Sequence, residues 1–473
     1  MKHLKTMQDI SDDLMQFVTS GGDERINLNP ETKTNKYHLN PLKFDGLFQR
    51  GSCTCGTFTP FGFEVANRFI DSFSEEKYAT ILNEQTNRLK NLLNNSELDF
   101  DVFYGPSGTD MMYLPLLFQK MLKPNSTIIN VVSCPEELGS GSKNAAECKY
   151  FSQLNQFGEQ IPCGESISID INSKVFYLPA REKQGHIENR NKAIREIIMR
   201  NSGEPIIGNL VFGSKSGIKD DLLIIDDFPE IMWVVDMCQF RTDRDLIYDL
   251  ISKDVLIMVT GSKFYQAPPY CGALLVPVKW TKMLKDVSGY PASYLNRIFS
   301  AFDFPEALQN IRENLVPFKN VGLRLRWEVA LSEMEAYLSF PQEETNAFIR
   351  RWNQIVTGRL ALSDSFQLMP DMELTNDSIV SFMVLVNGKA LSNLDLQRLY
   401  DFLVTHQHDG LDGYNHIFLG QPVQYGEKSF IRLSIGSYSV RNQLHNKRFE
   451  FNNDLRLIEI IEQSANKLFN KNA

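Results

Sequence analysis

The sequence predicts an α/β protein, with a large domain on a mostly parallel sheet sandwiched by helices and a smaller α+β domain after it. From about residue 60 to 315, short apolar runs alternate with longer helical patterns, which is typical of βαβ units around a buried sheet. After residue 320, a long helical stretch precedes strands of alternating polarity, which indicates a separate α+β unit. We therefore expect an N-terminal arm (1–60) that contributes to the small domain and the active site, a large domain (61–315) and a C-terminal small domain (316–473).

Each expected strand of the large domain is a short apolar run bounded by turn-forming residues. The runs lie at residues 100–104, 126–132, 205–212, 232–235 and 255–259. Because their residues are mostly apolar, each is expected to be buried on both faces. In the C-terminal part we expect a helix at about 323–337 and strands at 379–386 and 429–435. The arm, rich in Gly, Asn and Pro, is expected to consist mainly of loops.

Composition and charge narrow the classes of function. The 473 residues are 42% hydrophobic and 23% charged, which excludes a disordered or fibrous chain. Subtracting Asp plus Glu (58) from Lys plus Arg (49) gives −9, a balance that argues against nucleic-acid binding. No apolar run reaches the roughly 20 residues of a membrane helix, and the first residues lack a signal-peptide pattern. Seven scattered cysteines indicate reduced thiols. We expect a cytoplasmic protein that acts on small molecules.

The turn at 105–109 is the first candidate binding segment. It stands between an apolar run and a helical pattern. A Gly-containing turn that opens a helix presents free backbone N–H groups and the positive end of the helix dipole, which suit a phosphate. Ser107 and Thr109 add hydroxyl donors. An ordinary helix N-cap is the alternative interpretation. The absence of a Gly-Lys-Ser/Thr motif argues against an α/β nucleotide-binding protein.

Two later strands end in groups that carry chemistry. Asp236 follows the run at 232–235, and Lys263 follows the run at 255–259. Both are expected at the carboxyl edge of the sheet, where ligands bind in open α/β folds. A buried Asp requires a cationic or donor partner. Lys263 is either a surface residue or a desolvated amine able to form a Schiff base.

Together and in this order, the turn, the strand-end acid and the strand-end lysine resemble fold type I pyridoxal 5′-phosphate (PLP) enzymes. The last two are 27 residues apart (263 − 236). The segment 236–239, Asp-Met-Cys-Gln, is similar to the Asp-x-x-Gln of class V aminotransferases and cysteine desulfurases. The resemblance covers most of the chain.

The resemblance implies a role for each of these residues. Lys263 holds the cofactor aldehyde as an internal aldimine and later moves a proton, while Asp236 pairs with the pyridine nitrogen and keeps the ring an electron sink. Gln239 hydrogen-bonds the phenolic oxygen. The residues that the resemblance implies for the cofactor phosphate are Ser107, Gly108, Thr109, Thr260 and Ser262.

An arginine far downstream is the candidate substrate ligand. Arg432 lies in the expected strand at 429–435, 169 residues after Lys263 (432 − 263). The segment resembles the Arg-x-Ser by which fold type I enzymes grip a substrate α-carboxylate, and a planar guanidinium offers a carboxylate two parallel hydrogen bonds. The alternative is an exposed strand arginine.

Some features depart from this resemblance. The related enzymes stack an aromatic or His on the ring, yet residues 132–141 contain neither, so the stacking residue stays open. Whether Glu136 and Glu137 face the ring also stays open, although such a pair is more often a solvated turn, which is the interpretation we expect. The arm segments 35–38 and 50–52 are candidates for the substrate side of the site.

Cysteine and histidine groups raise the question of a metal. Cys53 and Cys55 lack the second pair or nearby His of a zinc site, so we expect a loop with two thiols. The cluster of His406, His408 and His416 is interpreted as a polar loop, because no carboxylate stands at a recognised ligand interval. No metal is expected.

The expected function is aminotransfer from an amino acid to a keto-acid acceptor, in a homodimer with sites at the interface, as the resemblance implies. β-Elimination, desulfuration and decarboxylation use the same core residues and are alternatives. A non-catalytic protein that keeps the fold for binding is a further alternative, against which the joint presence of Asp236, Lys263 and the turn argues.

Overall fold

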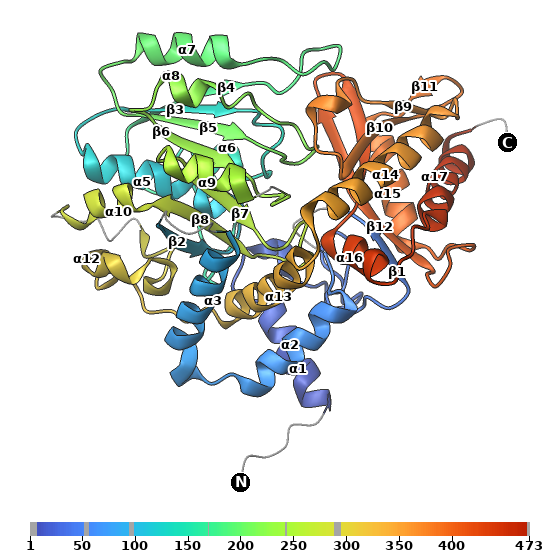
Figure 1. The fold of residues 1–473 in the computed structure, drawn as a ribbon, viewed down its shortest axis with the longest axis horizontal. Coiled ribbons are helices and arrows are strands. Elements are labelled where there is room, and N and C mark those ends of the chain that lie inside the picture. The colour runs from blue at the N-terminus through green and yellow to red at the C-terminus, as the bar shows by residue number, and fades with distance from the viewer. Residues whose placement is uncertain are drawn as a thin grey trace.

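A computed structural model describes residues 7–51, 56–93, 99–168, 170–241, 244–287 and 295–470 of the chain. Two sheets organise these residues (Figure 1). The larger sheet contains β2 (Phe100–Gly105), β3 (Ile128–Ser133), β4 (Ser173–Leu178), β5 (Ile206–Val211), β6 (Met232–Asp236), β7 (Leu256–Thr260) and β8 (Gly272–Pro277). The smaller sheet contains β1 (Leu47–Arg50), β9 (Phe366–Leu368), β10 (Ile379–Val386), β11 (Lys389–Ala390), β12 (His416–Tyr425) and β13 (Lys428–Ser434).

Helices pack around both sheets. The described α-helices of the first half are α1 (Met7–Val18), α2 (Pro60–Ser72), α3 (Tyr78–Leu93), α4 (Gly108–Met111), α5 (Tyr113–Leu122), α6 (Ser142–Ala146), α7 (Asn191–Arg200) and α8 (Ile224–Asp227). Those that follow are α9 (Arg244–Ser252), α10 (Val278–Lys285), α12 (Gln309–Arg312), α13 (Val321–Leu338), α14 (Gln342–Ala361), α15 (Asn393–Thr405), α16 (Ser437–His445) and α17 (Asn452–Phe469). Short 3-10 helices lie at Glu24–Ile26, Glu75–Lys77, Ala301–Asp303, Glu306–Leu308 and Met372–Leu374.

The larger sheet has the order β2-β8-β7-β6-β5-β3-β4. The pairs from β7 to β4 are parallel, whereas β8 is antiparallel to both β7 and β2. Every residue of β3, β5, β6 and β7 is buried, as their apolar runs predict, and so is every residue of β8, a strand that was not among the predicted runs. The expected mostly parallel sheet is therefore confirmed.

Alternate residues of each strand face different helices. On one face, Val131 and Ile257 belong to a cluster that includes side chains of α3, α7, α9 and α13. On the other face, Val132 and Met258 pack with side chains of α5, α6 and α10. Two helical layers thus bury the sheet, which leaves its strand ends as the edges open to a ligand.

The smaller sheet draws on both ends of the chain. Strand β1, from the arm, pairs in parallel with β12 at Leu47 and His416. The remaining pairs, β12–β13, β13–β10, β10–β11 and β10–β9, are antiparallel. Helix α13 packs against α1, α2, α3 and α16. A segment of the arm is in this way built into the same sheet as Arg432.

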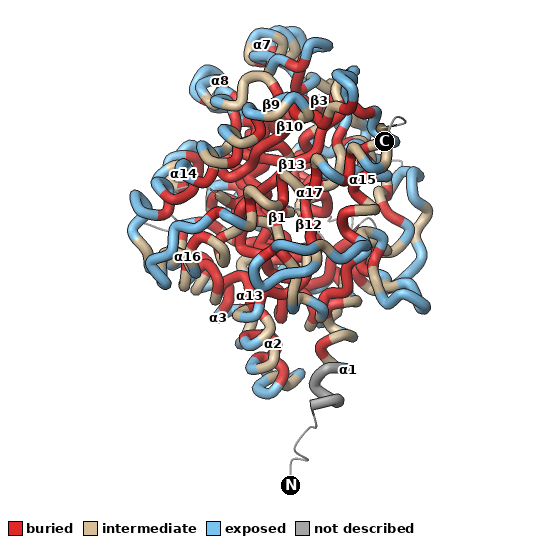
Figure 2. Tube along the Cα trace, turned by 90° about the vertical axis from the view of Figure 1, so that its right-hand side faces the viewer, coloured by how far each residue is buried: buried red, intermediate tan, exposed pale blue. Residues whose placement is uncertain are grey.

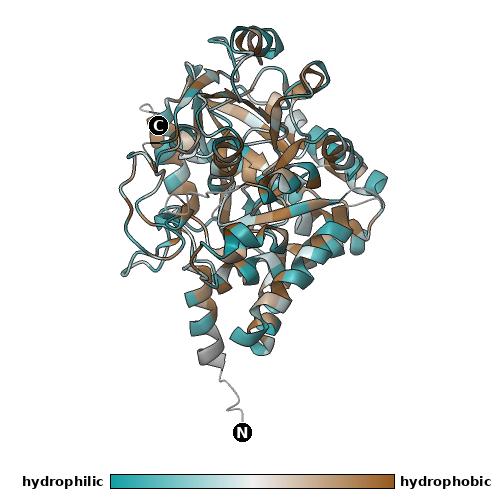
Figure 3. Cartoon of the chain, turned by 90° about the vertical axis from the view of Figure 1, so that its left-hand side faces the viewer, coloured by the Kyte–Doolittle hydropathy of each residue, from teal (hydrophilic) through white to brown (hydrophobic). Residues whose placement is uncertain are grey.

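Burial and hydropathy follow this layout. The buried positions form the centre, with exposed positions around the periphery (Figure 2). The strands of the larger sheet carry mostly hydrophobic residues, while the outer turns and loops are more hydrophilic (Figure 3). No described helix has the length and apolar character that a membrane crossing requires.

Candidate active site

A cavity of about 490 Å³ lies at the carboxyl edge of the parallel strands. Its walls come from the loops after β3, β5, β6 and β7, from strands β12 and β13, and from the arm. The lining residues are Arg25, Tyr37, Pro135, Glu136, Glu137, Leu138, Gly139, Ser140, Lys143, Lys215, Gln239, Lys263, Gln421, Pro422, Val423, Gln424, Tyr425 and Arg432. The fold therefore brings Lys263, Gln239 and Arg432 to one cavity, although they are widely separated in the sequence.

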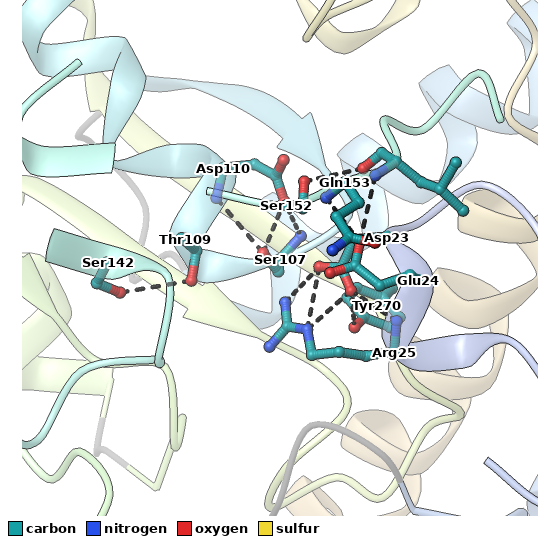
Figure 4. Close-up of polar contacts among 11 residues, drawn as sticks. Asp23, Glu24, Arg25, Ser107, Thr109, Asp110, Ser142, Ser152, Gln153 and Tyr270 are labelled. Carbon is teal, nitrogen blue, oxygen red and sulfur yellow. Dashed lines mark hydrogen bonds and ion pairs between the residues drawn. The ribbon is translucent and has the colours of Figure 1, made fainter. Parts of the chain in front are cut away.

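The turn before α4 is held by a capping box (Figure 4). The backbone N–H and the hydroxyl of Ser107 both donate to Asp110 Oδ2, at 2.8 and 2.6 Å. Burial raises the pKa of the Asp110 carboxyl to about 7, and the hydrogen bonds from Ser107 oppose that shift. Among the described residues, no acceptor is hydrogen-bonded to the backbone N–H of Gly108 or Thr109. These two groups remain able to bind an anion.

Close packing places this turn against the strand ends that border the cavity. A Cβ at Gly108 would lie 2.4 Å from Cys238 Sγ, so only glycine fits there without rearrangement. A Cβ at Gly139, in the cavity wall, would lie 2.8 Å from Thr109 Oγ1. The hydroxyl of Thr260 donates to the Cys238 carbonyl oxygen at 2.6 Å. The predicted phosphate turn therefore lies beside Cys238 and the cavity wall.

Asp236 ends β6 and is 7% exposed. Its Oδ1 accepts a hydrogen bond from the backbone N–H of Cys238 at 2.8 Å. No Lys, Arg or His of the described residues forms an ion pair with it. A buried carboxylate without a cation is costly, since a single backbone donor does not offset the loss of hydration. The position is thus suited to a cationic group supplied by a ligand.

The side chain of Gln239 is hydrogen-bonded by Arg241, a residue that the sequence analysis did not single out. Nε and Nη2 of Arg241 both donate to Gln239 Oε1 at 3.3 Å. Arg241 also donates to the carbonyl oxygen of Ile435 at 2.9 Å and to the hydroxyl of Ser378. Burial lowers the pKa of Arg241 to about 9. The guanidinium sets the orientation of the Gln239 amide and ties it to the smaller sheet.

Arg432 is buried, with 6% of its surface exposed, and not an exposed strand arginine. Its Nη1 donates to the Lys215 carbonyl oxygen at 2.7 Å, and its Nη2 donates to the Gln421 carbonyl oxygen at 3.0 Å. Its Nε is buried without a hydrogen-bond partner. The two terminal nitrogens therefore hold the guanidinium in place, and Nε is the nitrogen that makes no hydrogen bond.

The expected solvated pair Glu136 and Glu137 is wrong for its second member. Glu137 is 1% exposed, and its carboxylate accepts hydrogen bonds from the backbone N–H and the hydroxyl of Ser216 at 2.6 and 2.5 Å. The Glu136 carboxylate accepts from the Ala180 backbone N–H at 3.1 Å. The loop after β5 buries Glu137, and that contact cannot be inferred from the residues around position 137. The described residues of the loop after β3 that line the cavity include no aromatic residue and no His, so this loop supplies no residue that could stack on a ring.

The arm contributes less to the cavity than expected. Tyr37 lines it, whereas the side chain of His38 contacts Asp401 and Arg50 forms a buried ion pair with Asp454. Arg25, which the sequence analysis did not single out, also lines the cavity. Residues 52–55, and with them the cysteine pair, lie outside the described residues.

The histidines of the Gly/Asp-rich segment contact their own helix and loop. His406 stacks on Phe402 with ring centroids 4.1 Å apart, and His408 Nε2 lies 2.8 Å from the Leu403 carbonyl oxygen. His416 begins β12. The described part of the chain holds no cluster of three or more His, Cys, Asp or Glu side chains placed to bind a metal.

Comparison with solved structures tests the fold. A NifS-like protein from Rickettsia africae superimposes with a TM-score of 0.55 over 89% of this chain and 99% of that chain, at 12% identity. Alanine–glyoxylate aminotransferase from Nostoc sp. gives 0.54 over 93% and 99%, at 13% identity. Oryza sativa TDC, solved with PLP and tryptamine, gives 0.52 over 89% and 83%, at 12% identity. The chain has the fold of fold type I PLP enzymes.

At these identities, the likeness to fold type I PLP enzymes establishes the architecture alone. No protein-family model and no curated protein matches the sequence. The roles of individual residues therefore depend on the geometry of the cavity.

Proposed function

We propose that the chain is a PLP-dependent enzyme that carries its cofactor on Lys263. One observation carries this proposal: Asp236 is buried without a cation among the described residues, at the end of the strand next to β7, while Lys263 follows β7 and lines the cavity. A protonated pyridine nitrogen is a cation that a carboxylate in this position can pair with. The likeness of the fold to PLP enzymes supports the same cofactor.

The donor groups near the cavity fit a phosphorylated pyridine. Two of the residues expected to bind its phosphate, Ser107 and Thr260, have a different role. The N–H groups of Gly108 and Thr109 suit the phosphate, and the Ser262 hydroxyl has no hydrogen-bond partner among the described residues. The hydroxyls of Ser107 and Thr260 already donate to Asp110 and to a backbone carbonyl. We therefore assign those two residues to holding the turn and the strand end, and leave the phosphate to the other three.

When bound, the cofactor supplies an electron sink for charge that develops at the substrate α-carbon. Asp236 keeps the pyridine nitrogen protonated. Lys263 would tether the cofactor and would hold or move the proton at the substrate α-carbon. Gln239, oriented by Arg241, would donate to the phenolic oxygen of the cofactor. Arg432 binds the substrate α-carboxylate.

Aminotransfer between an amino acid and a keto acid is the proposed reaction, in a cytoplasmic homodimer. An aminotransferase among the similar structures supports it. A PLP-dependent lyase is the second candidate, because the cysteine desulfurase CsdA from Escherichia coli has the same fold and Lys263, Asp236 and Arg432 serve either reaction.

Two measurements test the proposal. Borohydride reduction of the PLP-loaded protein should fix the cofactor on Lys263, and a peptide map with the label on another lysine would overturn the assignment. A panel of amino acids should convert bound PLP to its amine form if the reaction is aminotransfer. Release of a keto acid, amine or sulfide with the PLP absorption unchanged would establish the lyase instead.

A further inference from the structure

Two residues of the cavity wall each carry a buried donor without an acceptor. Arg432 Nε and Gln421 Nε2 are both buried atoms that make no hydrogen bond. Both side chains line the same cavity as Lys263. The Arg432 Nη2 donates to the backbone carbonyl of Gln421, so the two residues are direct neighbours. An unpaired buried donor is unfavourable, and one on each of two neighbouring residues suits an acceptor with two oxygens.

A β-bulge creates this arrangement. Gly420 pairs with Arg432 and Val423 pairs with Phe430, so two residues of β12 stand opposite one residue of β13. A bulge of this kind redirects side chains and interrupts the pairing of the strands. Pro422, which has no backbone N–H, lies within the bulge. The bulge thus accounts for a glutamine at the cavity wall beside Arg432.

Gly420 makes room for the arginine. A Cβ at this position would lie 3.2 Å from Arg432 Nε and 3.0 Å from Arg432 Cβ. A larger residue would therefore press on the edge of the guanidinium that has no acceptor.

The carboxylates that line the same cavity are already engaged. Glu137 accepts from Ser216 and Glu136 accepts from the Ala180 backbone. No Asp or Glu of the described residues forms an ion pair with Arg432. The acceptor must therefore come from a ligand.

We propose that Gln421 is a specificity-determining residue, which binds one oxygen of a substrate carboxylate through Nε2 while Arg432 binds the other through Nε. The inference rests on the proposed PLP-dependent function and assigns its substrate class as compounds that carry a carboxylate beside the reacting amine. It differs from the fork-like grip expected from the sequence, because each terminal nitrogen of Arg432 already donates to a backbone carbonyl, whereas Nε donates to no protein acceptor.

The test uses two reagents that react with bound PLP, of which only one carries a carboxylate. Aminooxyacetate and methoxyamine each displace Lys263 and change the PLP absorption, so the ratio of their second-order rate constants measures carboxylate recognition without knowledge of the natural substrate. In the PLP-loaded protein, Gln421→Met should lower the rate constant of aminooxyacetate by about 10- to 100-fold, the effect of losing one hydrogen bond to a charged group. Methoxyamine should react at the wild-type rate.

Gln424→Met is the matched control, because Gln424 lines the same cavity but its Nε2 already donates to the Gly426 carbonyl oxygen at 3.2 Å. It should leave both rate constants unchanged. Gln421→Glu provides a second variant if the methionine protein does not fold: it should slow aminooxyacetate further through charge repulsion and spare methoxyamine.

A folded Gln421 variant that changes neither rate constant, or both equally, would overturn the role of Gln421 and leave the proposed function intact. If neither reagent changes the spectrum of the wild-type protein, PLP chemistry itself is refuted, and this inference with it.

Discussion

Replacing Asp236 by asparagine should stabilise the cofactor-free chain and, in the same variant, remove most of the stabilisation that PLP gives. Asp236 is 7% exposed and accepts one backbone hydrogen bond from Cys238. Burial of a carboxylate without a cation costs several kcal/mol, whereas one charge-assisted hydrogen bond returns about 1.5–3 kcal/mol. Asparagine has the same shape and can accept the same hydrogen bond. We therefore expect the cofactor-free variant to gain about 1 kcal/mol.

With PLP bound, the order of stability reverses, and the wild-type chain becomes more stable than Asp236→Asn. A ligand at 100 times its Kd stabilises a protein by about 2.7 kcal/mol. Removal of one partner of a buried ion pair costs about 3–5 kcal/mol, which exceeds that gain. At a PLP concentration that stabilises the wild-type chain by about 2.7 kcal/mol, PLP should stabilise the Asp236→Asn variant by less than about 1 kcal/mol.

Equilibrium urea unfolding, followed by circular dichroism with and without PLP, measures both quantities. Asp454→Asn is a control, because Asp454 is buried but already paired with Arg50, and its variant should be destabilised equally in the two conditions. If Asp236→Asn destabilises the cofactor-free chain by about 2 kcal/mol or more, or if PLP stabilises it as much as the wild type, Asp236 has a structural role and the pairing with PLP is refuted.

Three further predictions concern stability. Asp454→Asn should cost about 3–5 kcal/mol in urea unfolding, because it leaves Arg50 buried at 3% exposure without its partner at 2.6 Å. The pKa of Asp110 is raised from 3.8 to about 7, so the protonated form stabilises the fold below pH 4 and this contribution is lost as the pH rises through 7. The difference between wild type and Asp110→Asn, from urea unfolding of the cofactor-free proteins at pH 4 and 8, should change by about 4 kcal/mol; a constant difference would contradict the shift. Gly208→Ala would place a Cβ 2.2 Å from Trp233 Cζ3 and should cost about 1–3 kcal/mol by overpacking; an unchanged urea midpoint would contradict it.

Local sequence patterns predicted much of the fold. The expected strand at 379–386 coincides with β10, and the helix expected at 323–337 lies within α13. Both are set by short-range periodicity, which the chain carries in its own residues. The pairing of β1 with β12 joins Leu47 to His416 and leaves no local signal. The arm was therefore expected to contain loops, and its strand was missed.

The candidate site was predicted only in part, because local patterns mark some of its residues and leave no signal for their partners. Lys263 and Asp236 stand at strand ends, which the apolar runs mark, so their place at one edge of the sheet could be expected. The partners of these residues come from elsewhere in the chain. Ser216 buries Glu137, and the bulge in β12 brings Gln421 to Arg432. Tertiary contacts decide such features, and no pattern within a few residues of either position encodes them.

The charge of the cavity opposes the charge of the chain. The chain has a net charge of −9, yet the charged groups that line the cavity are five basic and two acidic residues. They are Arg25, Lys143, Lys215, Lys263 and Arg432, against Glu136 and Glu137. Both acidic side chains accept hydrogen bonds from the surrounding backbone, which disperses their charge. A cleft lined by one sign of charge concentrates ligands of the other sign. The acidic balance that argues against nucleic-acid binding is therefore compatible with a cavity that attracts phosphates and carboxylates.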